Sequence, residues 1–285
     1  MKHFFIITNA RKDQNLHLTQ KIISYIEEKG GTAASMASVD DDGSHPVVEA
    51  DIPAQTECIL VIGGDGTLIR AARDTVALQI PLIGINLGKL GYLCELEEST
   101  IGQALDELFA DHYIIEERMM LGGYAKKQTK ETGEQIALND IVIHRTGALQ
   151  IVNLNVYVNG EYLYSFRADG IILSTPTGST GYNMSAGGPI VDPNAKMILM
   201  TPINSHTLSS RSIVISAEDE VVIELGCRRN EKDEQVEVSF DGDHNIRLEV
   251  GDQIVVHRAQ AYAKILKISK VSFLEILRKK METYT

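Results

Sequence analysis

The sequence predicts two domains of different class: an N-terminal Rossmann-like α/β domain and a C-terminal β-sandwich domain. Up to about residue 116, short apolar runs of strand type alternate with apolar stripes at helical spacing, which is typical of a parallel sheet flanked by helices. From about residue 117, short alternating strands separated by polar turns replace that pattern. We therefore expect an α/β domain in residues 1–116, a β-rich domain in residues 117–267, and a C-terminal helix in residues 268–285 that returns to the first domain.

The composition is typical of a soluble globular protein and limits the partners. Hydrophobic residues make up 44% and charged residues 23% of the 285 positions. The formal net charge of −12 argues against a nucleic-acid partner, because binding a phosphate backbone requires a basic face. No segment approaches membrane-spanning length, and the apolar run at residues 4–7 is too short for a signal-peptide core. We therefore expect a cytoplasmic protein without nucleic-acid or membrane partners.

The three cysteines show no sign of a metal site or a disulfide framework. Cys58, Cys94 and Cys227 are widely spaced, with no CxxC pattern and no histidine pair at metal-ligand spacing. We expect buried or inert thiols in a reducing compartment, and no structural zinc.

The first 45 residues predict a strand–helix unit and a second strand. Residues 3–8 form an apolar run expected to be a buried strand, and residues 9–13 form a polar loop at its carboxyl end. The helical stripe that follows consists of Leu16, Ile22, Ile23 and Ile26 and ends at Gly30 and Gly31. Residues 32–36 are expected to be a second strand. Residues 38–45 are expected to be a solvated acidic loop without chemistry.

A glycine-rich turn at residues 63–67 is the first candidate site. An apolar strand pattern at residues 59–62 stops at Gly63, and a helical pattern begins just after Thr67. Gly63, Gly64 and Gly66 let a polyanion approach the backbone, and the first N–H groups of the helix point at it. The turn therefore suits phosphate.

Asp65 is the unexpected member of this turn. A carboxylate inside an anion-binding loop repels the ligand, unless it binds an accompanying metal ion or takes a proton from a hydroxyl that attacks the phosphate. The alternative is a tight strand–helix turn in which Asp65 acts as a local turn former.

A second strand end is expected beside the first. Residues 81–85 form a short apolar strand followed by Asn86, and residues 98–110 form the last helix of the domain. Ligands of parallel sheets lie beyond the carboxyl ends of the strands. We therefore expect the strand ends at Gly63 and Asn86 to face one crevice.

The second half reads as antiparallel strands. Asn159 and Gly160 lie between two alternating runs and predict a type I′ hairpin, because both residues tolerate positive φ. Further strands are expected at residues 212–216, 220–225, 235–240, 246–250 and 253–256. A lysine-rich hairpin tip at residues 126–130 is expected to be solvated rather than an anion site.

Asn139 and Asp140 are a candidate recognition pair at the start of a strand. Alternation places the two side chains on opposite faces, or side by side if the strand bulges there. An amide can read a base edge or a ribose hydroxyl, and a carboxylate can accept from hydroxyls. The alternative is an ordinary turn or edge feature.

Residues 169–189 form the longest patterned loop. A strand that begins after Asp169 runs into a segment rich in hydroxyl groups and glycines, which suits a phosphorylated, polyhydroxylated ligand. Tyr182 offers a flat face for a base. The alternative is an irregular connection of the sandwich.

Taken together and in order, these motifs resemble the ATP-NAD kinase family. The resemblance rests on the Gly63–Thr67 turn, on Asn139 followed by an acidic residue, and on the hydroxyl-rich loop from Thr175 to Pro189. Similarity continues in residues 88–93, in residues 202–211 and at Asp241 and Gly242, so it covers most of residues 58–245. The glycine–aspartate motif alone is shared with diacylglycerol kinases, sphingosine kinases and phosphofructokinases, whereas its combination with the loop is specific.

The resemblance implies transfer of the γ-phosphoryl group of Mg-ATP to the 2′-hydroxyl of the adenosine ribose of NAD, which makes NADP. It assigns the general base to Asp65 and ATP phosphate binding to Gly63, Gly64, Gly66 and Thr67. It places around NAD the residues Asn139, Asp140, Arg167, Asp169, Thr177, Thr180, Gly181, Tyr182 and Ser185. It also implies Mg²⁺ or another divalent ion with ATP, and a homodimer or homotetramer. The metal ligands stay unassigned.

The chain departs from the family pattern at four positions. Asp140 stands where Glu is common, and Gly181 stands where Ala is common. Ser212 replaces a frequent Pro, and Asp243 replaces a frequent Gln. None of these changes removes a reactive group, but the first two alter the reach and shape of the surface offered to the adenosine.

Two other functions fit parts of the sequence. A lipid kinase of the diacylglycerol type explains the glycine turn and a β half, but it has no use for the hydroxyl-rich loop. A non-catalytic nucleotide sensor explains the pocket residues, but it needs no base, so Asp65 counts against it.

Overall fold

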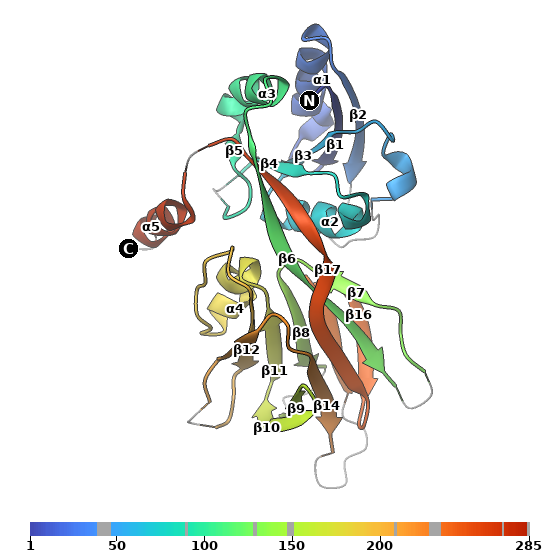
Figure 1. The fold of residues 1–285 in the computed structure, drawn as a ribbon, viewed down its shortest axis with the longest axis vertical. Coiled ribbons are helices and arrows are strands. Elements are labelled where there is room, and N and C mark those ends of the chain that lie inside the picture. Colours follow the sequence, from blue (N-terminus) through green and yellow to red (C-terminus); the bar gives the residue numbers. More distant parts are fainter. Residues whose placement is uncertain are drawn as a thin grey trace. The chain divides into compact units, whose positions relative to one another are not determined.

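A computed structural model of the chain describes residues 1–38, 47–88, 91–127, 130–146, 151–207, 210–227, 235–269 and 271–283 (Figure 1). The chain forms two compact units, Met1–Arg118 with Tyr262–Thr285, and Met119–Ala261. The predicted fold class is confirmed: the first unit is α/β and the second is built from antiparallel strands. The ligand-binding roles and limits predicted for the two domains stay predictions, and residues 39–45 of the predicted acidic loop lie outside the described residues.

The sheet of the first unit is parallel. Its strands are β1 (His3–Asn9), β2 (Thr32–Ser38), β3 (Cys58–Gly63), β4 (Leu82–Asn86) and β5 (Leu96–Glu97). The order is β2-β1-β3-β4, and the outer side of β4 pairs with β5 and with the end of β17 (Gln253–Lys267), where Ile265 lies opposite Leu82. Every residue of β3 is buried, because a parallel sheet covered on both faces favours continuous apolar runs.

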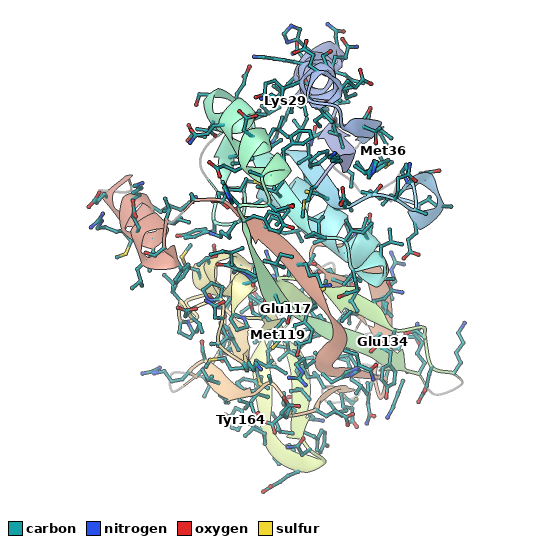
Figure 2. The ribbon with its side chains drawn as sticks, turned by 45° about the horizontal axis from the view of Figure 1, so that its top comes forward. Lys29, Met36, Glu117, Met119, Glu134 and Tyr164 are labelled. Carbon is teal, nitrogen blue, oxygen red and sulfur yellow. The ribbon has the colours of Figure 1, made fainter. Side chains whose placement is uncertain are left out.

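Helices cover this sheet with apolar stripes. They are α1 (His17–Glu28), α2 (Asp65–Thr75) and α3 (Ile101–Phe109). The unit also contains α5 (Phe273–Thr283), none of whose described residues is buried, and short 3-10 turns at Gln14–Leu16, Glu49–Asp51, Val76–Leu78 and Glu98–Thr100. Ile22 and Ile26 of α1, one turn apart, join a buried cluster with Phe4 and Ile6 of β1. Lys29 lies just beyond α1 (Figure 2) and forms an exposed 2.8 Å ion pair with Asp106 of α3. No described helix is both long and apolar enough to span a membrane.

The second unit contains two antiparallel arrangements of strands. One follows the order β10-β9-β14-β17 with β6 and β7 attached, and the other follows β13-β12-β11-β8-β15-β16. The strands are β6 (Ile114–Lys126), β7 (Gln135–Ala137), β8 (Asp140–Arg145), β9 (Val152–Val158), β10 (Glu161–Ala168), β11 (Gly170–Ser174), β12 (Met197–Ile203), β13 (Ile213–Ser216), β14 (Val221–Gly226), β15 (Gln235–Phe240) and β16 (Asp243–Glu249). A 3-10 turn at Thr177–Thr180 and a short helix α4 (Tyr182–Ser185) follow β11.

The two arrangements pack against each other through buried faces. A Cβ added to Gly123 of β6 would lie 3.1 Å from Ile141 of β8 and 3.2 Å from Phe240 of β15, so only glycine fits there without rearrangement. The first half of the edge strand β10 is exposed, and Tyr164 there is 43% accessible (Figure 2). The unit is therefore a sandwich with a polar, partly aromatic outer surface.

The hairpin prediction is confirmed, whereas one strand is longer than predicted. Asn159 and Gly160 adopt φ angles of 51° and 80°, as a type I′ turn between β9 and β10 requires. Strand β17 runs for 15 residues, although the sequence pattern predicted a strand only at residues 253–256. Its later half interleaves alanines with Gln260, Tyr262 and Lys264, and these small and polar residues carry little strand signal of their own.

Candidate active site

The glycine turn lies between β3 and α2. Strand β3 ends at Gly63, Gly64 is the N-cap in an extended conformation, and α2 begins at Asp65. A Cβ on Gly63 would come within 2.4 Å of the Thr67 hydroxyl, so the side chain of Thr67 folds back over the turn. The first N–H groups of a helix have no partner within it, and they carry the positive end of its dipole. The turn therefore has the geometry of a phosphate-binding loop.

The two strand ends predicted to share a crevice do meet. Gly63 and Asn86 are register partners in the parallel pair of β3 and β4. The N–H of Leu87 donates to the carbonyl oxygen of Gly63 at 2.9 Å, and the Asn86 amide donates to the Gly88 carbonyl at 3.1 Å. Polar groups therefore gather at the carboxyl edge of this sheet, where ligands of such sheets bind.

Asp65 is held by three consecutive peptide N–H groups. Oδ2 accepts from Tyr92 at 2.6 Å, and Oδ1 accepts from Leu93 at 3.3 Å and from Cys94 at 3.0 Å. A Cβ on Gly91 would lie 1.9 Å from Oδ1, so the backbone of this loop touches the carboxylate only because residue 91 is glycine. These donors stabilise the negative charge and fix its position. Oδ2 accepts one peptide N–H group and Oδ1 accepts two, and the Cys94 thiol also hydrogen-bonds the carboxylate. An ionised carboxylate is an acceptor only, so it can take up a proton.

The cysteine next to Asp65 is not a reactive group. Burial and the neighbouring Asp65 carboxylate raise the pKa of the Cys94 thiol, so it stays protonated. Burial likewise raises the pKa of the Cys58 thiol. Both fit the expectation of buried or inert thiols, and Cys227 is exposed. Within the described residues, no group of three or more His, Cys, Asp or Glu side chains could hold a metal ion.

In the second unit, Asp241 holds the start of β8. Its carboxylate accepts from the N–H groups of Leu138 at 2.7 Å, Asn139 at 2.7 Å and Asp140 at 3.1 Å. Asp241 itself lies in the turn between β15 and β16 with a φ of 52°. The backbone that carries the Asn139–Asp140 pair is therefore fixed by a side chain from a distant hairpin.

The hydroxyl-rich loop packs directly on this pair. The Thr175 hydroxyl donates to the Leu138 carbonyl at 2.6 Å. A Cβ on Gly181 would lie 3.5 Å from Asn139 Nδ2 and 3.9 Å from Asp140 Oδ2. The two side chains therefore lie side by side, as expected for an irregular strand start: Asn139 precedes β8, which begins at Asp140.

Two polar atoms at this place lack a partner. Among the described residues, the buried side-chain atoms without a hydrogen bond are Asn139 Oδ1, Thr177 Oγ1, Arg118 Nε and Ser210 Oγ. Buried polar atoms are nearly always paired, because leaving one unpaired costs about 1–3 kcal/mol. Asn139 Oδ1 and Thr177 Oγ1 are therefore placed to bond a ligand.

The pKa values of Asp140 and Asp169 are shifted in opposite directions. Burial, and then the charge of Asp241, raise the pKa of Asp140 to about 7. Hydrogen bonds from Asn204 and from Arg145 lower the pKa of Asp169, whose carboxylate lies 2.9 Å and 2.8 Å from them. Asp140 can therefore donate a hydrogen bond near neutral pH, whereas Asp169 is a fixed negative charge.

The structure brings together only part of the predicted NAD-binding set. Thr177 and Gly181 follow the end of β11, on the same side as Asp140, which is the register partner of Ser174. Asp169 and Arg167 precede β11, one strand length away, roughly 17 Å at 3.3 Å per residue. Arg167 is exposed, as is Tyr182, which is 47% accessible. Ser185 is exposed on α4, and the Thr180 hydroxyl bonds the Thr177 carbonyl at 3.4 Å. The set suits an elongated ligand.

Comparison with known proteins identifies the family. Residues 4–113 match the ATP-NAD kinase N-terminal domain, and residues 138–268 match the ATP-NAD kinase C-terminal domain. The chain belongs to the ATP-NAD kinase family. It is 57% identical to the NAD kinase of Agathobacter rectalis, with 100% of both chains covered. It is 41% identical to the NAD kinase of Lachnoclostridium phytofermentans, over 98% of this chain and 99% of that one.

Solved structures share the fold of this ATP-NAD kinase family member. Yeast NADH kinase complexed with NADH matches with a TM-score of 0.87 at 24% identity, over 99% of this chain and 88% of that chain. An NAD kinase from Archaeoglobus fulgidus in complex with ATP matches with a TM-score of 0.79 at 20% identity, over 99% of both chains.

The geometry adds residues that sequence reasoning did not place in the site. Lys12 follows β1, and its Nζ lies 2.8 Å from the position of a Cβ on Gly64, so a cation stands at the glycine turn. Asn183 is buried and ties the loop together, donating to the carbonyls of Ser179 and Pro189 at 3.2 Å and 3.0 Å. The only sequence signal for Lys12 was its position in a polar loop at the carboxyl end of the first strand.

Proposed function

We propose that this chain transfers the γ-phosphoryl group of Mg-ATP to the 2′-hydroxyl of the adenosine ribose of NAD, with Asp65 as the general base. Membership of the ATP-NAD kinase family supports the overall reaction. One observation carries the role of Asp65: it is a carboxylate at the start of α2, inside a phosphate-type turn, and three peptide donors fix its position. This carboxylate accepts the hydroxyl proton as the oxygen attacks phosphorus.

The glycine turn and Lys12 supply the electrostatics of transfer. Phosphoryl transfer passes through a loose transition state, so rate depends mainly on positioning and on neutralising charge. The N-terminal amides of α2 face the phosphate, and Lys12 adds a positive charge beside Gly64. Mg²⁺ or another divalent ion enters bound to ATP, as part of the substrate. Gly63, Gly64, Gly66 and Thr67 then act through their backbone and close packing rather than through reactive side chains.

The second unit holds the acceptor. Asn139 Oδ1 accepts a hydrogen bond from an amino or hydroxyl group of the adenosine, and Thr177 Oγ1 makes a second bond. Asp140 contributes a partly protonated carboxyl beside them, and Tyr182 offers an exposed ring for stacking. The rest of the dinucleotide extends along β11 toward Arg167 and Asp169, with Thr180, Gly181 and Ser185 lining the loop.

The proposal includes the setting of the reaction. We infer a cytoplasmic enzyme. As the resemblance to the family implies, we also infer that it works as a homodimer or homotetramer. Sedimentation of the purified protein checks the oligomer: a species of two or four chains supports it, and a monomer that is fully active contradicts it.

An endpoint assay tests the reaction itself. Purified protein is incubated with Mg-ATP and NAD, NADP is read with an NADP-specific dehydrogenase, and reactions without NAD or without ATP serve as blanks. We expect NADP only when both substrates are present. If NAD binds in a titration but no NADP appears, the chain is a nucleotide sensor and the proposal fails. If NAD does not bind at all, a lipid acceptor becomes the next hypothesis.

A further inference from the structure

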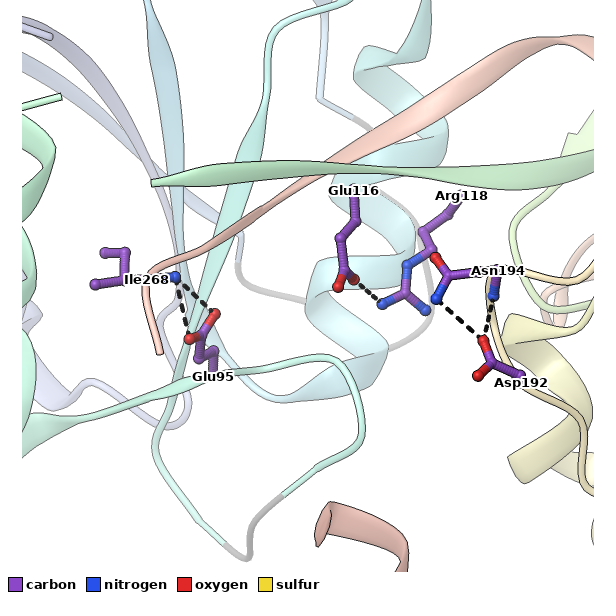
Figure 3. A network of polar contacts seen from close by, with 6 residues as sticks. All are labelled: Glu95, Glu116, Arg118, Asp192, Asn194 and Ile268. Atoms are coloured by element: carbon purple, nitrogen blue, oxygen red, sulfur yellow. Dashed lines mark hydrogen bonds and ion pairs between the residues drawn. The ribbon is translucent and has the colours of Figure 1, made fainter. Parts of the chain in front are cut away.

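The loop that holds Asp65 is itself held by the C-terminal end of the chain. Residues 92–94 donate their N–H groups to Asp65, and the carboxylate of the next residue, Glu95, binds a different part of the chain. Glu95 accepts from the N–H of Ile268 at 3.1 Å and 3.3 Å (Figure 3). It also accepts from the N–H of Ser269. The same four-residue segment therefore joins the proposed base to residues that follow the last strand.

A second contact joins the C-terminal helix to this loop. The Nζ of Lys280 in α5 lies 4.6 Å from the centroid of the Tyr92 ring, within the range of a cation–π interaction. Tyr92 makes the shortest of the hydrogen bonds to Asp65, at 2.6 Å. The loop of residues 92–95 is thus contacted at both of its ends, at Tyr92 and at Glu95, by the C-terminal segment, which consists of residues 268–269 and α5.

The C-terminal segment follows directly on the buried end of strand β17, which fixes its position. Ile265 pairs with Leu82 of β4, and Leu266 is fully buried in the core cluster of the first unit. On the other side, the N–H of Glu95 donates to the carbonyl of Gly84 in β4 at 3.2 Å. The position of Glu95 is therefore set by the parallel sheet and by residues 268–269 together.

We propose that Glu95, with the C-terminal segment it binds, is a positioning residue for Asp65: it keeps the N–H groups of residues 92–94 at the distance that fixes the carboxylate for proton transfer. This inference rests on the proposed role of Asp65. Glu95 acts only through the loop. Losing its carboxylate removes a charged acceptor from two peptide N–H groups and frees the loop, so the carboxylate of Asp65 loses its fixed orientation.

Glu95 is a suitable site for mutation. Its side chain is half-buried and lines a pocket of about 700 Å³ between β5, α3 and the residues after β17. Shortening it enlarges a hollow that is already open, rather than creating a closed cavity in the core. Glu95→Ala removes the carboxylate, Glu95→Gln keeps one neutral oxygen acceptor, and Glu98→Ala, three residues further on and exposed, is the matched control.

Two measurements on the full-length protein test the inference. The first is steady-state kinetics: we expect kcat of Glu95→Ala to fall about tenfold with KM for NAD and ATP within about twofold, because only the orientation of the base changes. Glu95→Gln should recover part of the loss, and Glu98→Ala should match the wild type. The second is hydrogen–deuterium exchange, in which the amides of residues 92–94 should exchange faster in Glu95→Ala than in the wild type.

The results separate this inference from the proposed function. Faster exchange at residues 92–94 with a selective fall in kcat supports it. A kcat of Glu95→Ala within twofold of the wild type, or unchanged exchange at those amides, overturns it. If Glu95→Ala does not fold, Glu95→Gln and Lys280→Met carry the same two readouts with smaller effects. A normal turnover of Asp65→Asn would instead defeat the proposed function, whatever the exchange shows.

Discussion

In each of the two units an aspartate carboxylate accepts hydrogen bonds from three consecutive peptide N–H groups, but the arrangement serves a different purpose in each. In the first unit, the Asp65 carboxylate accepts three consecutive peptide N–H groups from residues 92–94. In the second, the Asp241 carboxylate accepts three from residues 138–140. At Asp65 the carboxylate is the functional group and the peptide segment is the support. At Asp241 the carboxylate is the support and the segment carries the functional groups, Asn139 and Asp140. A carboxylate that accepts three consecutive peptide N–H groups is therefore not a catalytic residue for that reason alone. The groups around it determine whether it reacts or supports the backbone.

The largest effect is expected at Asp65. Asp65→Asn cannot accept a proton as a base, so turnover should fall at least about a hundredfold, while NAD affinity stays within a few-fold of the wild type. Steady-state kinetics with a direct NAD titration checks both parts. Turnover near that of the wild type would remove the assigned role.

A smaller loss of turnover is expected from a substitution that crowds the peptide segment around Asp65. Gly91→Ala places a methyl group where the Asp65 carboxylate lies, since the added Cβ would come within 1.9 Å of Oδ1. We expect kcat to fall about tenfold with little change in KM, because the base is displaced rather than removed. Gly102→Ala in α3, whose Cβ would meet only Tyr25 at 4.0 Å, is the control and should be fully active. Equal activity of the two variants would mean that the loop adjusts without cost.

In the second unit the effect should move from turnover to affinity. Asn139→Ala removes a buried oxygen that has no partner in the protein, so the apparent affinity for NAD should fall about tenfold, close to the value of one hydrogen bond. The melting temperature without NAD should be unchanged or higher, because an unpaired buried acceptor is lost. A calorimetric titration with NAD checks the affinity, and a thermal melt checks the melting temperature. Unchanged NAD affinity would take Asn139 out of the site.

The smallest effect concerns pH and Asp140. Its pKa is raised to about 7 in the folded protein from an ordinary value near 3.8, so the folded state holds a proton that the unfolded state has lost. Stability from this group is therefore greatest at low pH and declines as pH rises through about 4 to 7. Asp140→Asn should remove that decline, and its melting temperature should rise relative to wild type between pH 5 and 7.5. A parallel pH dependence in both proteins would contradict the raised pKa.

Local chemistry made much of this architecture predictable. The glycine turn, the Asn159–Gly160 hairpin and the alternation in β9 depend on residues close in sequence, and each matches the observed conformation. The meeting of Gly63 with Asn86 follows from the rule that parallel strands end on one side. Predicted residue roles rested on the family resemblance, and they stay proposals.

Long-range contacts were beyond reach of the sequence alone. Asp241 binds Asn139 across 102 residues, and Glu95 binds Ile268 across 173. No local pattern marks such pairs, since an aspartate in a turn and a glutamate beside a strand are both ordinary surface choices. The second half of β17 was missed for a related reason, because its alanines become buried only through the neighbours that the fold supplies.

The contrast between the Asp65 and Asp241 carboxylates is tested most directly by a single-turnover measurement on Asp65→Asn and Asp241→Asn, at saturating Mg-ATP and NAD. We expect the transfer rate of Asp65→Asn to fall at least about a hundredfold at saturation, whereas that of Asp241→Asn should stay within about threefold of the wild type once more NAD is supplied. Equal losses of transfer rate in both variants, or a larger loss in Asp241→Asn, would contradict the division of roles between the two carboxylates.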